Sequence, residues 1–188
     1  MGLALRSEEP LWLWLAYGLL PMAIRKIRTY GDPVLTQPAL PVRQVDSAIR
    51  RLAEDMIETM YDAPGVGLAG PQVGVQLRIF VYDAGDGPNT VLNPVLSGHS
   101  GDWEYEEGCL SVPGYYWPII RPGQVHLEGE DLDGNRLSID ADEYLARIFQ
   151  HETDHLDGAL LLTRLTDAQR KQALRDIRRY GLSPEADE

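Results

Sequence analysis

The chain has 188 residues, 44% of them hydrophobic and 24% charged, which is the composition of one globular domain large enough to bury a core. The formal net charge of −12 argues against DNA binding, because that role needs a basic surface that displaces counterions. The single cysteine excludes an internal disulfide, and beside a suitable histidine pattern it indicates a nucleophile or a metal ligand.

The N-terminal end differs from the rest of the chain. Residues 11–20 (LWLWLAYGLL) are apolar, but the run is too short for a membrane span, which needs roughly 20 residues, and it lacks the features of a secretory signal. Three interpretations of residues 1–21 stay open. We favour a mis-assigned start, with Met22 as the initiator, over an extension that packs on the domain or a partner and over a targeting segment.

Residues 22–182 are expected to form a single α+β domain, followed by a flexible tail over 183–188. A helix is predicted over residues 46–61, where apolar side chains recur at steps of three and four. Asp46 is placed to cap its first turn, and Pro64-Gly65 marks its end.

Short apolar runs with β-branched and aromatic residues predict strands in the middle of the chain. Residues 78–82 (RIFVY) are one such run. Residues 124–131 and 135–139 flank Leu132-Asp133-Gly134, and Asp-Gly is a strong turn signal, so the pair is predicted to form a hairpin.

Two more helices are predicted near the C-terminus. The first covers residues 141–156, with Asp140 as its cap. The second covers residues 167–180 and opens on Thr166 and Gln169, which have the spacing of a capping box.

The first of these helices carries the clearest chemical signal, the sequence His151-Glu152-Thr153-Asp154-His155. Residues four apart share one helix face, so both imidazoles can reach one metal ion. Glu152 lies about 100° around the helix axis from His151, close enough to act as general base on a metal-bound water.

A catalytic metal site of this type usually has a third protein ligand and an open position for water. Residues 156–188 contain no His or Cys. Cys109 remains, in the polar segment Glu107-Gly108-Cys109-Leu110-Ser111. We therefore predict that Cys109, His151 and His155 are the metal ligands, against the alternative that a lone cysteine is a buried small hydrophobe.

Three segments together resemble the signatures of the peptide deformylase family. They occur in the family's order and spacing, within a similarity that covers about residues 22–180. They are Gly65-Val66-Gly67-Leu68-Ala69-Gly70-Pro71-Gln72, similar to G-φ-G-φ-A-A-x-Q, then Glu107-Gly108-Cys109-Leu110-Ser111, matching EGCLS, and Gln150-His151-Glu152-Thr153-Asp154-His155-Leu156-Asp157-Gly158, matching QHExDHLxG.

The resemblance implies a fold in which antiparallel β-sheets pack around a central helix that bears the HExxH motif, with an N-terminal and a C-terminal helix. It implies that the chain hydrolyses the N-formyl group of N-terminal formyl-methionine in newly made polypeptides and releases formate. A metal-bound water would attack the formyl carbon, with Glu152 as general base and then acid. The Gln72 amide and the Leu110 backbone N–H would stabilise the oxyanion.

The resemblance also implies how the peptide is held. The backbone at Val66 and Gly67 would pair with the extended substrate like an added strand. Tyr144 and Ile148 share the helix face of the histidines and are candidates for the methionine pocket, the alternative being plain core. Fe²⁺ is the metal that the resemblance implies in the cell, with Zn²⁺ or Ni²⁺ open by ligand type.

Three features lie around these motifs. Gly70 stands where the family has a second alanine, which would loosen that loop. Thr153 stands where isoleucine or methionine is common, and its hydroxyl could bond the backbone one turn back. Arg121 follows the cysteine segment and is a candidate ion-pair partner for Glu107.

The C-terminal helix has a charge opposite to that of the chain. From Arg164 to Tyr180 there are six basic and two acidic side chains, a net of +4 where the chain carries −12. Some deformylases dock this helix on the ribosome, and the predicted helix has the charge to do so; a solvated basic face is the alternative. The acidic chain, without a transit-type leader, indicates a cytoplasmic bacterial protein, with an organelle left open.

Two other functions are compatible with an HExxH motif. One is a zinc protease or another amidase, which the missing downstream ligand and the EGCLS cysteine disfavour. The other is a structural Cys/His₂ metal site in a ribosome-associated binding module, which is disfavoured because structural sites are normally closed by four protein ligands and no fourth candidate is found.

Overall fold

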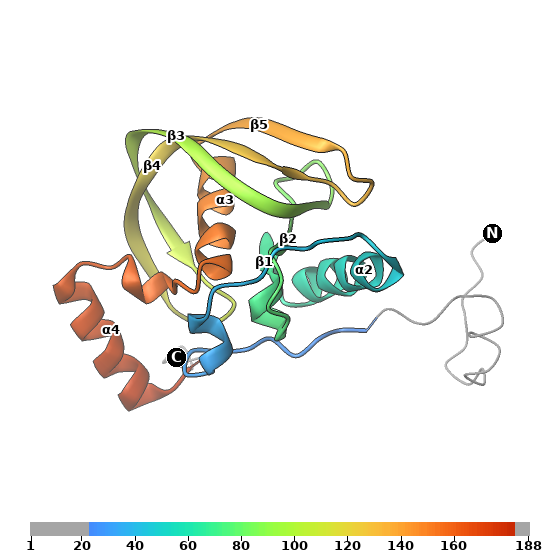
Figure 1. Cartoon of the computed structure of the whole chain (residues 1–188). Coiled ribbons are helices and arrows are strands. Elements are labelled where there is room, and N and C mark those ends of the chain that lie inside the picture. The colour runs from blue at the N-terminus through green and yellow to red at the C-terminus, as the bar shows by residue number, and fades with distance from the viewer. Residues whose placement is uncertain (1–22, 183–188) are drawn as a thin grey trace, which may run out of the picture.

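A computed structural model describes residues 23–182, so the interpretations made for 1–21 and 183–188 concern segments outside the described residues. The described chain forms a five-stranded sheet in which every pair is antiparallel and the strand order is β1-β2-β3-β4-β5. The sheet curves around helix α3 (Figure 1). The predicted α+β architecture around a central HExxH helix is therefore confirmed, with one continuous sheet.

The strands are β1 Gly67–Ala69, β2 Ile79–Tyr82, β3 Asn89–Gly108, β4 Tyr116–Glu130 and β5 Arg136–Asp142. The α-helices are α2 Ser47–Asp62, α3 Glu143–Leu156 and α4 Asp167–Tyr180, and the 3₁₀ turns are η1 Pro33–Thr36, η2 Gly70–Val73 and η3 Leu161–Thr163. Within residues 23–182, no helix has the length and apolar character that crossing a membrane requires.

Helix α2 begins and ends where the sequence indicates. The Asp46 carboxylate accepts a hydrogen bond from the Ile49 amide at 2.9 Å, as an N-cap does. The helix ends at Asp62, just before Pro64-Gly65. Its buried face, which includes Met56 and Met60, packs on β1 and β2 and so fixes the position of the segment after the helix.

Strands β3 and β4 form a long, bent hairpin whose loop contains Cys109. The register shifts between Leu92 and Val95 and again between Ser97 and Ser100. Such bulges bend a strand and increase its twist, which allows the sheet to wrap around a helix. No strand is predicted for residues 89–108 from the sequence, because the alternation of apolar and polar residues is interrupted at these bulges.

Helix α3 begins two residues later than predicted. Its first residue is Glu143 and its N-cap is Asp142, so the prediction of Asp140 as the cap is wrong. The reason is tertiary: β5 pairs with β4 as far as Gln124↔Asp142, and these ladder bonds hold residues 140–142 in an extended conformation. The predicted hairpin turn before β5 is confirmed, with the Asp131 carboxylate accepting from the Asp133 and Asn135 amides at 2.8 and 2.9 Å.

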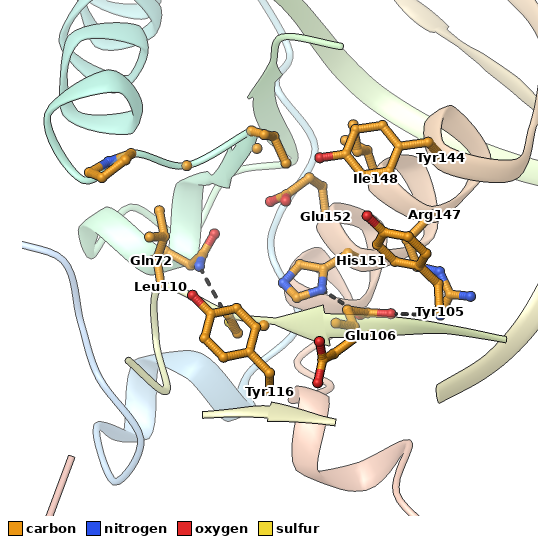
Figure 2. A pocket seen from close by; sticks show the side chains of 17 residues that line it. Gln72, Tyr105, Glu106, Leu110, Tyr116, Tyr144, Arg147, Ile148, His151 and Glu152 are labelled. Atoms are coloured by element: carbon orange, nitrogen blue, oxygen red, sulfur yellow. Dashed lines mark hydrogen bonds and ion pairs between the residues drawn. The ribbon is translucent and has the colours of Figure 1, made fainter. Parts of the chain in front are cut away.

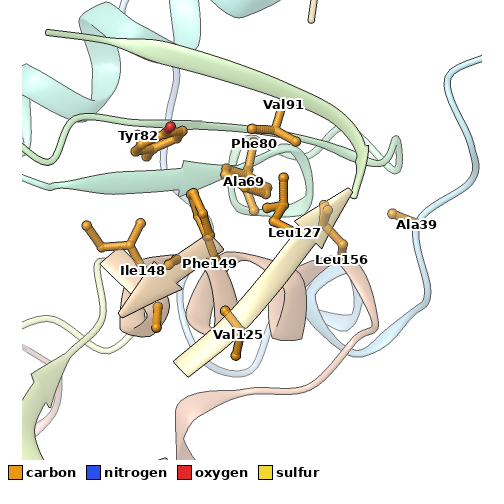
Figure 3. Packing of buried hydrophobic residues seen from close by; sticks show 12 residues of the cluster. Ala39, Ala69, Phe80, Tyr82, Val91, Val125, Leu127, Ile148, Phe149 and Leu156 are labelled. Atoms are coloured by element: carbon orange, nitrogen blue, oxygen red, sulfur yellow. The ribbon is translucent and has the colours of Figure 1, made fainter. Parts of the chain in front are cut away.

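The apolar face of α3 packs into the concave side of the sheet (Figure 3). Phe149 is fully buried and lies edge-on to Tyr82, with 5.1 Å between ring centroids. Deleting a buried phenylalanine typically costs about 3–5 kcal/mol, so this contact strongly fixes the helix against the sheet. The face that carries the histidines then turns toward the β3–β4 loop.

Helix α4 lies at the outer edge of the molecule (Figure 1), where its apolar side packs against Ile119 of β4. It opens with the predicted capping box, in which Thr166 N donates to Gln169 Oε1 at 3.0 Å and Gln169 N donates to Thr166 Oγ1 at 3.3 Å. Ala173 is its one buried residue. The rest of the helix is exposed or half-buried and leaves its basic side chains at the surface.

Candidate metal centre and active site

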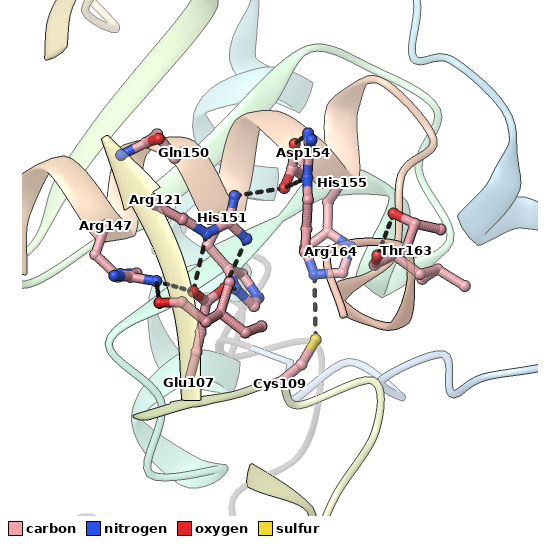
Figure 4. A network of polar contacts seen from close by, with 12 residues as sticks. Glu107, Cys109, Arg121, Arg147, Gln150, His151, Asp154, His155, Thr163 and Arg164 are labelled. Carbon is pink, nitrogen blue, oxygen red and sulfur yellow. Dashed lines mark hydrogen bonds and ion pairs between the residues drawn. The ribbon is translucent and has the colours of Figure 1, made fainter. Parts of the chain in front are cut away.

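The structure brings together the three predicted metal ligands. Cys109 comes from the β3–β4 loop, and His151 and His155 lie on α3. Their ligand atoms all lie within 4.8 Å of one another, and Cys109 Sγ is 3.2 Å from His155 Nε2 (Figure 4). One thiolate and two imidazoles are a donor set that fits a borderline or soft divalent ion and leaves a coordination position open.

The charges in this cluster favour the metal-binding form of the cysteine. Burial alone would raise the pKa of the Cys109 thiol, but the neighbouring His155 and His151 outweigh it and lower that pKa. Burial likewise opposes protonation of His151, but the Cys109 thiolate raises the His151 pKa. The two imidazoles thus favour the thiolate form of Cys109, which is the form that binds a metal ion.

A buried carboxylate fixes the orientation of His151. Glu107, only 5% exposed, lies 2.6 Å from His151 Nδ1 through its Oε1 atom. An ionised carboxylate only accepts hydrogen bonds, so Nδ1 is the protonated nitrogen and Nε2 keeps its lone pair for the metal. The contact thereby sets both the ring orientation and the tautomer of a ligand.

Glu107 belongs to a buried charge network (Figure 4). Arg121 donates from Nε and Nη2 to the two Glu107 oxygens at 2.9 and 2.7 Å, which confirms the predicted ion pair. Arg121 also donates from Nη1 to Asp154 at 2.7 Å, and Arg164 pairs with Asp154 from the other side. Burial would raise the pKa of Glu107, but the hydrogen bonds and charges of His151 and Arg121 hold it well below its usual value.

Glu152 lies beside the metal ligands with one oxygen uncommitted. The residue is 3% exposed, and its Oε2 atom has no hydrogen-bond partner among the described residues. Burial is the largest cause that raises its pKa, to about 7, in the protein without a metal. A methyl group on Gly67 would come within 2.8 Å of Glu152 Cδ, so the absence of a side chain there leaves room for this carboxylate.

Gln72 is buried with its amide group held in one orientation. Its Oε1 accepts from the Ala69 backbone N–H at 2.8 Å, so the NH₂ group must point the other way. Nε2 donates to Ser111 Oγ at 3.2 Å and lies 3.8 Å from Cys109 Sγ. Gln72 and Leu110 both line the same cavity (Figure 2), and their role as oxyanion donors stays a prediction.

A cavity of about 280 Å³ opens over the cluster (Figure 2). All four residues predicted to bind substrate line it: Val66, Gly67, Tyr144 and Ile148. Tyr144 is 39% exposed, whereas Ile148 is buried and also belongs to the core, and the methionine pocket stays a prediction for both.

Three further residues that line the cavity were missed from the sequence: Tyr105, Tyr116 and Arg147. The alternating aromatic residues Trp103 and Tyr105 were the available signal for a strand there. Their rings stack at 4.8 Å, and Tyr105 packs against Tyr144 at 5.9 Å.

The fold and the site define a class of protein: α+β proteins in which an HExxH helix and a Cys/His₂ cluster lie at the base of an open cavity. Comparison with known proteins then gives the family. The family model described as polypeptide deformylase matches residues 24–171. The chain belongs to the peptide deformylase family of metal-dependent hydrolases.

Individual relatives agree with that assignment. The chain is 48% identical to a peptide deformylase from Acidothermus cellulolyticus over 84% of this chain and 87% of that protein. The crystal structure of peptide deformylase from Thermus thermophilus superposes with a TM-score of 0.79 at 44% identity, over 83% of this chain and 94% of that one.

Some of the solved relatives are complexes with a small molecule. The Ehrlichia chaffeensis peptide deformylase in complex with actinonin has a TM-score of 0.79 at 38% identity and covers 84% of this chain and 98% of its own. Family membership makes the chain an enzyme and disfavours the binding-module and protease alternatives.

Proposed function

We propose that the chain removes the formyl group from the N-terminal formyl-methionine of newly made polypeptides, with its metal held by Cys109, His151 and His155. The observation that carries this proposal is the uncommitted Glu152 carboxylate, buried beside a Cys/His₂ cluster at the base of an open cavity. Fe²⁺ is the ion proposed for the cell, and Zn²⁺ or Ni²⁺ suits the same donors.

When bound, the divalent ion supplies Lewis acidity and a water of lowered pKa. Glu152 takes the proton from the attacking water and passes it to the leaving amine. Burial raises the pKa of Glu152, which supports the second step, because a base that binds its proton too weakly returns it poorly. Glu152 is only 3% exposed, so the proton that it holds is largely shielded from bulk water.

The negative charge on the formyl oxygen is stabilised by two donors of the chain, the Gln72 side-chain amide and the Leu110 backbone N–H. The fixed orientation of Gln72 supports this role, because its NH₂ group needs no reorganisation during the reaction. Loss of one such donor typically lowers the rate by roughly 10²–10³.

The substrate backbone is proposed to add to β1, which is the edge of the sheet. One side of β1 pairs with β2, with Gly67 opposite Tyr82, and Val66 and Gly67 also line the cavity. An edge strand leaves backbone groups free for an extended peptide. Tyr144 and Ile148 receive the methionine side chain.

We place this activity in the bacterial cytosol, because the relatives with the matching sequences come from bacteria.

The basic face of α4 is proposed to dock on the ribosome, the source of the substrate. Arg175, Arg178 and Arg179 lie on this helix, which is mostly outside the core, and their charges support contact with phosphates. Charge reversal at these three positions should abolish co-sedimentation with ribosomes at low salt while leaving hydrolysis of a short peptide intact. Unchanged co-sedimentation would show that the face is merely solvated.

The main test is formate release from a formyl-Met-Ala-Ser peptide by anaerobically purified protein, with metal content assayed. Glu152→Ala should lose activity while the metal stays bound, because Glu152 is not a ligand. An unformylated peptide and casein serve as controls for cleavage of internal peptide bonds. A metal-loaded wild type that releases no formate, even after Fe²⁺ or Ni²⁺ reconstitution, would refute the proposed function.

A further inference from the structure

The metal ligands come from two separate parts of the fold. Cys109 lies in the loop of the β3–β4 hairpin, whereas His151 and His155 lie on α3. Their spacing therefore depends on how the hairpin sits on the helix. The apolar core holds α3 against the sheet, and buried polar contacts join the same helix to the end of the hairpin near Cys109.

Arg147 connects these two parts at three points. It lies on α3, one turn before His151, and is 3% exposed. Nη1 donates to Glu107 Oε2 at 2.9 Å and to the Ile119 carbonyl at 3.0 Å, and Nη2 donates to the Trp103 carbonyl at 2.6 Å. Trp103 and Glu107 belong to β3, and Ile119 belongs to β4, so one side chain holds both strands of the hairpin.

The guanidinium group also lies over the indole ring of Trp103, 5.1 Å from its centroid. Arg147 Nε has no hydrogen-bond partner among the described residues. A buried cation with an uncommitted N–H is unfavourable unless other interactions compensate, and the Glu107 carboxylate and the aromatic face both do so. The guanidinium group therefore stays charged while buried, and its separate nitrogens reach acceptors on both strands.

We propose that Arg147 is a positioning residue that sets the spacing between Cys109 and His151, by clamping α3 to both strands of the hairpin and by sharing the carboxylate that orients His151. This inference rests on the proposed metal site. Arg147 acts on the metal through Glu107 and through the hairpin, and it is not itself a ligand.

Lysine cannot replace this arrangement. The acceptors are a side chain and two carbonyls on different strands, which the planar guanidinium reaches from two separate nitrogens. An ammonium group is a single point of donation. Arg147→Lys should therefore keep the charge next to Glu107 but lose part of the clamp, whereas Arg147→Met keeps the apolar stem and loses both.

The test measures metal affinity directly, by competition between Zn²⁺ and a chelating dye, in wild type, Arg147→Met and Arg147→Lys. Loss of residues that orient metal ligands typically lowers affinity about 10–100-fold, and we expect this range for methionine and a smaller loss for lysine. The absorption spectrum of the Co²⁺-substituted protein, which reports ligand geometry, should change in both variants.

Arg25→Met is the matched control. Arg25 donates through Nε and Nη2 to Asp55, a buried carboxylate on α2, at 3.2 and 3.0 Å, so its loss removes an arginine from a buried carboxylate outside the clamp, although the Arg25 side chain is more exposed than that of Arg147. The control should lower the free energy of unfolding without altering the Zn²⁺ affinity or the Co²⁺ spectrum.

The outcomes separate the two proposals. Arg147 variants that are destabilised like the control but bind Zn²⁺ as wild type does, with an unchanged Co²⁺ spectrum, would overturn the positioning role. If Arg147→Met does not fold, the lysine variant carries the same comparison. A wild type that binds no metal through Cys109 would instead overturn the metal site itself.

Discussion

Replacing Glu107 by glutamine tests the buried network that supports the site. Four N–H groups converge on this carboxylate: Arg121 Nε and Nη2, Arg147 Nη1 and His151 Nδ1. Glutamine has nearly the same shape but puts an NH₂ group where one oxygen stood. That NH₂ group then faces two donors, so two charge-assisted hydrogen bonds are lost and two buried guanidinium groups lose their counter-charge.

The magnitude follows from these contacts. Each hydrogen bond to a charged group contributes about 1.5–3 kcal/mol, and breaking a buried ion pair from one side costs about 3–5 kcal/mol. We expect Glu107→Gln to lower the free energy of unfolding of the metal-free protein by about 3–5 kcal/mol. For a domain of this size, that corresponds to a fall in the melting temperature of about 10 °C.

The loss should depend on pH with a definite sign. The pKa of Glu107 in the folded protein lies well below its ordinary value of 4.5, so its stabilising contribution is present above about pH 4.5 and is lost as the pH falls below that value. Glutamine does not titrate. The stability difference between wild type and variant should therefore shrink as the solution is acidified.

Urea denaturation of both metal-free proteins at several pH values measures this difference. Glu106→Gln, an exposed neighbour on the same strand, is the matched control for loss of one negative charge and should change stability little. A Glu107→Gln difference below about 1 kcal/mol at neutral pH, or one that grows in acid, would refute the reasoning.

Further predictions concern the site and the glycine loop. The kcat/KM for a formyl-methionyl peptide should rise with pH, with a midpoint at or below about pH 7, because Glu152 must be deprotonated and a bound cation lowers its pKa. A kcat/KM that falls as the pH rises to 7 would contradict the role of Glu152 as general base. Gly67→Ala should leave Zn²⁺ bound but lower kcat, because the methyl group displaces the Glu152 carboxylate, whereas a proportional loss of metal would point to general misfolding. Gly70→Ala should lower the free energy of unfolding by about 1–3 kcal/mol in urea titrations, because its Cβ would lie 2.8 Å from the Val75 and Leu77 carbonyl oxygens. A neutral or stabilising effect would show that the loop relaxes around the methyl group. Zn²⁺ at about a hundred times its Kd should raise the free energy of unfolding by about 2.7 kcal/mol, and no shift in the denaturation midpoint would argue against a folded-state site.

The structure corrects one expectation from the sequence. The Thr153 hydroxyl, expected to bond the backbone one turn back, has no hydrogen-bond partner among the described residues. The expectation that Gly70 loosens its loop stays a prediction, and a Cβ at this position would meet two backbone carbonyl oxygens, those of Val75 and Leu77.

The sequence by itself determined the features that depend on local spacing. Two histidines four residues apart share a helix face wherever that helix lies, and caps such as Asp46 and Thr166 act within one turn. The single cysteine outside the helix left few choices for a third ligand. The three signature segments added the reaction that these residues imply.

Only the tertiary structure decided how these parts meet. The bulges that bend β3 depend on cross-strand pairing, and the start of α3 at Glu143 depends on the β4–β5 ladder, so neither is encoded in a local window. The clamp from Arg147 to Trp103 and Ile119 joins residues 44 and 28 positions apart, and the cavity wall of Tyr105 and Tyr144 depends on that docking. A buried charged side chain forms hydrogen bonds with the groups that packing of the core brings next to it. These partners lie far away in the sequence, so the periodicity of the sequence does not predict them.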